Sequence, residues 1–206
     1  MSPSGSTRGL SAPTVGRRAI LRIVAGVAMT ASARPGAAQT MTSVLPSFQA
    51  ALLAKIVSYD RNFAARAIDR AKLLLVVEPN DLESRGVVSQ LANALGSIAS
   101  VGGLPHLEEV VPFSSAASIA NTCVSHRISI VYFGPGLMDH IQDIGRALRS
   151  VDVLSVAAVP DYVPRGVVLG FASYSDNVKI LLNREQGRAQ NVNFGARMLR
   201  RMTIVG

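Results

Sequence analysis

The sequence is poor in the residues on which nucleic-acid-binding and disulfide-stabilised proteins depend. Among 206 residues there is no tryptophan, and aromatic residues make up only 5%. So few aromatic side chains argue against a surface that stacks on bases. Cys123 is the only cysteine, which excludes an intramolecular disulfide. It lies in an amphipathic helical stretch, and we interpret it as a small buried hydrophobe rather than a reactive thiol. The domain must therefore depend on its hydrophobic core.

Acidic residues are missing from one region, residues 1–38, which holds five arginines. The whole chain carries a formal charge of +8, but residues 39–206 account for only +3 of it. That modest excess is typical of ordinary solubility charge, so the basic composition does not predict a nucleic-acid partner.

The N-terminal region has the order of an export signal. A basic stretch ending in Arg17-Arg18 precedes an apolar run over residues 23–33, which is shorter than the about 20 residues of a membrane span. Small residues follow, and Gly36 and Ala38 form a small-x-small pattern, so we expect processing after Ala38. Residues 31–33 are a second possible site. The arginine pair fits both a Sec signal and a twin-arginine signal, and we therefore assign residues 1–38 to a signal peptide of either route.

Past residue 39 the pattern alternates between helical and strand periods. Residues 72–77 form a continuous apolar run of strand length, and 107–113, 128–133 and 153–157 are further predicted strands, separated by amphipathic stretches of helical spacing. This order predicts one three-layer α/β domain over residues 39–206 with a mostly parallel sheet. Two further strand-like stretches, 166–171 and 178–182, flank the turn residues 174–177 and predict a C-terminal hairpin. We expect Asn80 to cap the second helix, and a last helix to close the domain with Phe194, Met198 and Met202 inward.

Catalytic and metal-binding patterns are missing from the sequence. The three histidines lie on different predicted elements without ligand spacing, and we interpret them as surface or capping residues: His106, His126 and His140. Glu108 and Glu109 are adjacent on a predicted strand, so they point to opposite faces and cannot act as an acid–base pair. Residues 134–136, Gly-Pro-Gly, could expose amides to an anion, but a tight strand-to-helix turn is the favoured interpretation. We expect no enzyme activity, no metal and no cofactor.

Two segments are candidates for binding a partner. Residues 59–63, Tyr-Asp-Arg-Asn-Phe, follow the first helix and either pack and cap it or offer Tyr59, Asp60 and Arg61 to a partner. The predicted last helix places three arginines outward, either as a solvated face or as a binding surface: Arg197, Arg200 and Arg201.

Several short stretches, taken in order, resemble a known family. They are the end of the first helix at residues 54–63, the strand 166–171 that ends in Gly-Phe, residues 179–183, and the Ala-Arg element in 194–199. Together they are similar to the YfiR family of exported bacterial proteins, over roughly residues 45–206.

The resemblance implies an exported, non-enzymatic periplasmic regulator. Relatives bind the periplasmic part of a membrane-bound diguanylate cyclase and hold it inactive, which lowers cyclic-di-GMP and biofilm formation. Their control is linked to disulfides, whereas Cys123 alone cannot form an internal redox switch. The implied partner is a membrane signalling protein, a cyclase or a kinase, and a homodimer stays open. The alternative function is a periplasmic small-ligand module of a sensory or transport system, because α/β crevices are natural ligand sites.

Overall fold

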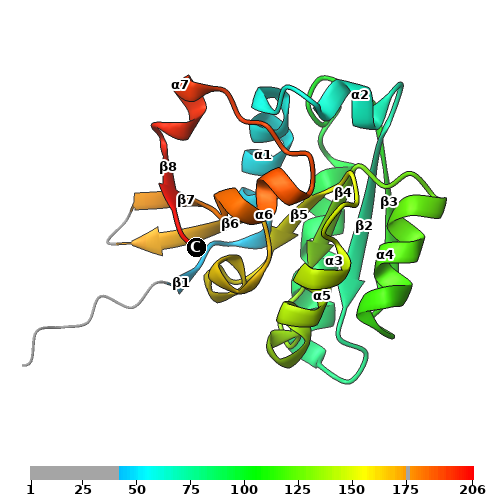
Figure 1. Cartoon of the computed structure of the whole chain (residues 1–206). Helices are drawn as coiled ribbons and strands as arrows, with labels where there is room; N and C mark the ends of the chain where they lie inside the picture. The colour runs from blue at the N-terminus through cyan, green and yellow to red at the C-terminus, as the bar shows by residue number, and fades with distance from the viewer. Residues whose placement is uncertain (1–41, 175–176) are drawn as a thin grey trace, which may run out of the picture. The chain divides into compact units, whose positions relative to one another are not determined.

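A computed structural model describes residues 42–174 and 177–206, so the predicted signal peptide with Gly36 and Ala38 lies outside the described residues. The described part is built around a single mixed sheet (Figure 1). Its strands are β1 (Thr42–Ser43), β2 (Ala71–Val77), β3 (His106–Pro112), β4 (Ile130–Phe133), β5 (Leu154–Ala157), β6 (Leu169–Tyr174), β7 (Asn177–Leu182) and β8 (Met202–Ile204). The helices are α1 (Pro46–Ile56), α2 (Phe63–Ala67), α3 (Leu82–Gly96), α4 (Ala116–Ser125), α5 (Ile141–Ala147), α6 (Arg184–Ala189) and α7 (Ala196–Leu199). Three 3-10 turns complete the set: η1 (Val57–Tyr59), η2 (Met138–His140) and η3 (Pro160–Arg165).

The sheet has the order β3-β2-β4-β5-β6-β7-β8, with β1 paired to β6. The five strands from β3 to β6 are parallel, and β6 and β7 form an antiparallel hairpin. The predicted α/β class, the mostly parallel sheet and the hairpin are therefore confirmed.

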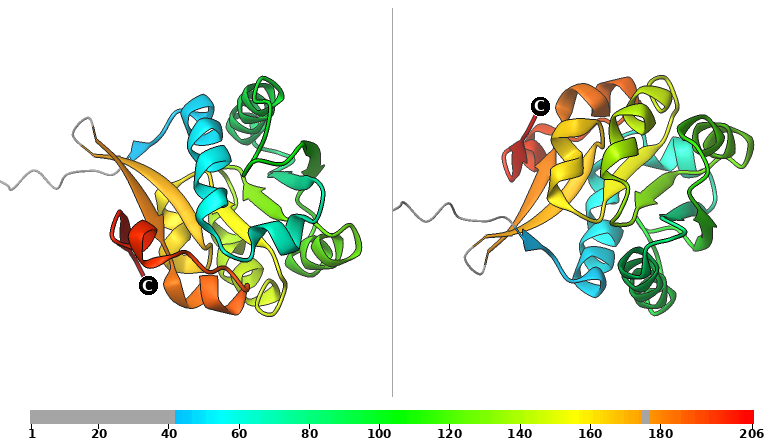
Figure 2. Two further views of the ribbon diagram at one scale, coloured as in Figure 1. Left: turned by 90° about the horizontal axis from the view of Figure 1, so that it is seen from above. Right: turned by 90° about the horizontal axis from the view of Figure 1, so that it is seen from below.

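Helices cover both faces of the sheet (Figure 2). Side chains alternate along β2, so Leu73 and Leu75 enter one core with α1 and α3, whereas Leu74 and Val76 enter a second core with α4 and α5. This explains why β2 is a continuous apolar run, because a parallel strand in the middle of such a sheet is buried on both faces.

The C-terminal end differs from the predicted closing helix. Only Ala196–Leu199 are helical in α7, and Met202 begins β8, which pairs in parallel with β7. Phe194, Met198 and Met202 are buried, as expected from their spacing of four, but pairing with β7 makes the last residues extended. Helix α6 was not predicted, because its sequence Arg-Glu-Gln-Gly-Arg-Ala has no apolar stripe.

The cap predicted for α3 was wrong by one residue. Asp81, not Asn80, is the N-cap, and its Oδ1 accepts hydrogen bonds from the backbone amides of Glu83 and Ser84 at 2.8 and 3.3 Å. The N-cap of α4 is Ser115, whose Oγ accepts from the Ser118 amide at 3.1 Å.

Candidate functional site

The segment after α1 turns its side chains in opposite directions. Tyr59, which we expected to pack on the core if the segment were structural, has 55% of its surface exposed, whereas Phe63 is buried. Between them, Arg61 is exposed and the side chain of Asp60 is wholly buried. Of the three candidate residues in this segment, only Tyr59 and Arg61 are accessible to a partner.

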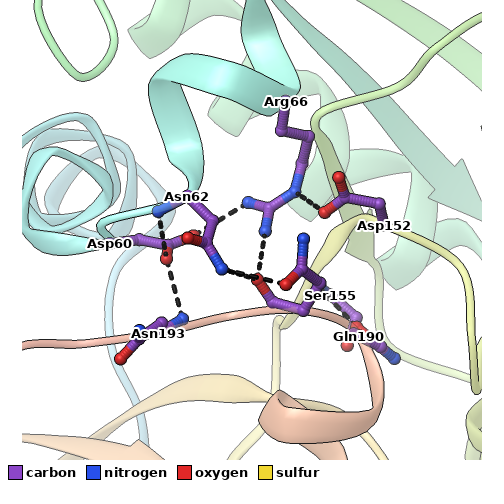
Figure 3. A network of polar contacts seen from close by, with 8 residues as sticks. Asp60, Asn62, Arg66, Asp152, Ser155, Gln190 and Asn193 are labelled. Atoms are coloured by element: carbon purple, nitrogen blue, oxygen red, sulfur yellow. Dashed lines mark hydrogen bonds and ion pairs between the residues drawn. The ribbon is translucent and has the colours of Figure 1, made fainter.

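Asp60 is buried because it is the centre of a polar network (Figure 3). One carboxylate oxygen pairs with Arg66 Nη1 at 2.9 Å, and the other accepts from the backbone amides of Asn193 and Asn62 at 2.8 and 3.2 Å. Arg66 also reaches Asp152 Oδ1 at 2.8 Å and the Asn191 carbonyl at 3.0 Å. A buried charge is tolerated only when its hydrogen-bonding positions are filled in this way.

The network fastens the segment after α1 to the C-terminal segment. Asp60 and Phe194 form an isolated antiparallel bridge, and the Arg61 amide donates to the Asn193 carbonyl at 2.9 Å. Asn62 adds a side-chain bond to the Asn191 carbonyl at 2.8 Å. Residues that are about 130 positions apart in the sequence are thereby held side by side.

This arrangement brings the two predicted binding segments together on one surface. Tyr59, Arg197 and Arg201 line a hollow of about 230 Å³ whose other lining residues are Ile180 and Met198. We call this hollow the Tyr59 hollow.

The remaining candidate arginines lie beside the Tyr59 hollow without lining it. Arg200 is exposed directly after α7. Nη2 of Arg61 lies 3.7 Å from the position that a Cβ atom on Gly195 would occupy. The surface therefore joins an aromatic side chain with several cations, a combination frequent at the centres of protein interfaces.

Other features of this region were not predicted from the sequence. A second hollow of about 200 Å³ adjoins α6 and is lined by Arg184, Arg188, Phe194 and Leu199 among others. We call it the α6 hollow. The network residues Arg66 and Asp152 were also missed, because nothing in their local sequence indicates that they meet.

The crevice at the carboxyl ends of the parallel strands is largely filled by the chain itself. The topological switch point lies between β2 and β4, where doubly wound proteins bind ligands. A Cβ on Gly134 would lie 2.8 Å from Ser84 Oγ, so α3 packs directly on the loop. Gly136 has φ +85° and faces Asp81 Oδ2, a carboxylate that disfavours a bound anion. The loop 134–136 therefore acts as the tight turn that the sequence favoured.

The histidines make local contacts. His106 was expected at the surface or in a cap, but its ring is largely buried, with one nitrogen against Glu108 and the other 2.7 Å from the Ile98 carbonyl oxygen. Nδ1 of His126 lies 3.6 Å from Oε2 of Glu109, and both side chains are about half exposed. Within residues 42–174 and 177–206, no cluster of three or more metal-ligating side chains occurs.

Cys123 lies on the inner face of α4 and is buried, as predicted. Burial raises the pKa of its thiol to about 12, because the thiolate would lose its hydration. At pH 8 the side chain is therefore a protonated, unreactive thiol.

We expect iodoacetamide to modify Cys123 very slowly in the folded protein and rapidly in the urea-unfolded protein, as measured by mass spectrometry. Fast modification without denaturant would show that the thiol is reachable.

Comparison with known proteins places this architecture in a family. The family model described as YfiR/HmsC-like matches residues 46–201. The chain belongs to the YfiR/HmsC-like family. The match begins with α1 and includes the Tyr59 hollow and the α6 hollow, so both lie within the part that defines this YfiR/HmsC-like domain. A comparison with curated protein sequences finds no match.

Solved structures share the fold of this YfiR/HmsC-like domain. A conserved domain protein from Vibrio cholerae has a TM-score of 0.54 and 10% identity, with 78% of this chain and 60% of that chain covered. An ABC domain from Streptococcus pneumoniae in complex with L-Trp has a TM-score of 0.54 and 11% identity, with 79% and 62% covered. The chain thus spans about three fifths of the length of these structures. In the part that the structure describes, no helix has both the length and the hydrophobicity of a membrane span.

Proposed function

We propose that this protein is an exported periplasmic regulator that binds the periplasmic part of a membrane-bound signalling protein, a diguanylate cyclase in the first instance, and keeps it inactive. The observation that carries the proposal is the family match over residues 46–201. The export-like order of residues 1–38 supports the location. The exposed surface around Tyr59, Arg197 and Arg201 supplies a place for a protein partner.

Restraint of this kind requires no chemistry. The domain needs only to bind the inactive state of its partner more tightly than the active state. A difference of about 1.4 kcal/mol in binding free energy shifts the partner's equilibrium tenfold. A rigid surface suits this task, and the Asp60–Arg66 network fixes the two segments that form it.

Deleting the gene is expected to raise cyclic-di-GMP and surface attachment, because the cyclase loses its restraint. Re-expression of the full chain should reverse both effects. A chain lacking residues 1–38 serves as the control, since it stays in the cytoplasm and should restore neither. Unchanged cyclic-di-GMP after deletion would contradict the proposed function.

A small-ligand module remains the second candidate, favoured by the likeness in fold to a protein solved with L-Trp. A hollow of about 190 Å³ lies near the carboxyl ends of β4 and β5, with Pro135 and Ala158 in its lining. Gln49 also lines it, but its amide already bonds to protein groups. If deletion lowers uptake of a solute and leaves cyclic-di-GMP unchanged, this function replaces the first.

A further inference from the structure

Resting on the proposed function, we infer the chemistry of the partner segment: the face formed by α6, α7 and the Tyr59 hollow binds an acidic segment of the partner protein that carries apolar side chains beside its carboxylates. We call this face the arginine face. Its arginines are Arg61, Arg184, Arg188, Arg197, Arg200 and Arg201.

The arginine face holds the positive charge of the exported part of the chain. Residues 184–201 contain five arginines and one acidic residue, Glu185, a net charge of +4. Residues 39–206 as a whole carry +3, so the rest of the domain is slightly acidic. A positive electrostatic potential on one face attracts a negatively charged partner and orients it during encounter.

The cations of this face are not neutralised within the domain. In the described residues, none of its six arginine side chains forms an ion pair or a side-chain hydrogen bond. Elsewhere in the described part of the domain three arginines are paired: Arg66 with Asp60, Arg146 with Asp143, and Arg149 with Glu185. In the last pair Arg149 binds Glu185, the only acidic residue of 184–201, so Glu185 does not neutralise an arginine of the face. Four others form no ion pair there either (Arg70, Arg85, Arg127 and Arg165), so the face is distinguished by the number of unpaired arginines that residues 184–201 gather. The free guanidinium groups are suited to bidentate binding of carboxylates.

Hollows with apolar walls lie between these cations. Met198 and Ile180 line the Tyr59 hollow, whereas Leu199, Phe194 and Val192 line the α6 hollow. Helix α7 lines both, with Arg197 and Met198 in the Tyr59 hollow and Leu199 in the α6 hollow, so the hollows are neighbours. An extended or helical segment with two apolar side chains could fill both while its carboxylates meet the arginines.

A protein segment fits this face better than an anionic membrane surface. Clustered cations by themselves attract an anionic membrane surface, whereas the apolar walls of the two hollows add contacts that a protein segment with apolar side chains can use. Tyr59, half exposed at the rim beside Arg197 and Arg201, supplies the rigid aromatic contact that is enriched at protein interfaces.

Peptide selection tests the inference. The full chain is expressed with export and purified from the envelope, and a phage-displayed library of random peptides is selected on it. Enriched peptides should combine Asp or Glu with apolar residues. Two double variants, Arg197→Glu with Arg201→Glu and Arg184→Glu with Arg188→Glu, should each weaken binding of these peptides by about tenfold or more. The matched control, Arg85→Glu with Arg165→Glu, reverses two exposed arginines elsewhere and should leave binding within about twofold.

Three results would overturn the inference. The first is enrichment of peptides without acidic residues, and the second is peptide binding that the arginine-face variants leave unchanged. The third is arginine-dependent binding to vesicles of phosphatidylglycerol and phosphatidylethanolamine without binding to acidic peptides, which would assign the face to the membrane surface. Circular dichroism of each variant establishes that it is folded.

Complementation of the deletion strain separates this inference from the proposed function. If wild-type protein and the control variant lower cyclic-di-GMP but the arginine-face variants do not, both stand. If the arginine-face variants also lower it, the face is not the docking site and the regulator function stands. If cyclic-di-GMP never responds while acidic peptides still bind through the arginines, the proposed function fails and the chemistry of the face stands.

Discussion

Replacing Arg66 with methionine is expected to lower the free energy of unfolding by about 3–5 kcal/mol, because the wholly buried carboxylate of Asp60 would lose its charged partner. Arg66 also donates to Asp152 and to the Asn191 carbonyl, but Asp152 is half exposed and the carbonyl keeps its bond from Asn62, so most of the loss comes from Asp60. Urea unfolding followed by circular dichroism measures the loss.

A matched variant and a second substitution test this cause. Arg70→Met removes an exposed arginine that follows α2 and lacks an ion pair among the described residues, and should change stability by no more than about 0.5 kcal/mol. Adding Asp60→Asn to Arg66→Met should recover part of the loss, since the buried charge is gone. Equal losses for Arg66→Met and Arg70→Met would contradict the structural role of the network.

Replacing Gln49 with leucine is expected to lower the free energy of unfolding by about 2–5 kcal/mol, because this one buried amide forms hydrogen bonds with three groups that leucine cannot serve. Its Nε2 donates to the carbonyls of Val44 and Ala158 at 2.7 and 3.1 Å, and its Oε1 accepts from the Tyr132 hydroxyl at 3.0 Å. Burial raises the pKa of Tyr132, so its hydroxyl keeps the proton that it donates. The amide thereby joins α1 to the segment before it and to β4.

A double-mutant cycle separates the hydroxyl contact from the rest. Tyr132→Phe should cost more stability in the wild-type background than in Gln49→Leu, because leucine has already removed the hydroxyl's partner. Ser47→Ala, at an exposed position of α1, is the control and should change stability little. Additive losses in the cycle would show that the Gln49–Tyr132 bond contributes nothing.

The layered fold could be predicted because its signals are local. Apolar runs such as Leu73–Val77 specify a strand buried on both faces, and the structure divides their alternate side chains between two cores. The C-terminal elements were harder, since Phe194, Met198 and Met202 are spaced as in a helix and are buried, yet Met202 lies in β8. A spacing of four indicates which residues are buried, but strand pairing with β7 decides the backbone conformation there.

Some features of the candidate site follow from the sequence, and others are decided only by the tertiary structure. The sequence by itself determined the fold class, the family resemblance, the absence of an internal disulfide and the exposed arginines near residue 200. It could not decide that Tyr59 faces outward while Asp60 is buried, because these are adjacent residues in one polar segment. That decision depends on Arg66 and on the Asn193 amide, a group 133 positions away in the chain. Only the folded chain brings such distant groups within hydrogen-bonding distance, and the free energy of satisfying a buried carboxylate then fixes the orientation of its neighbours.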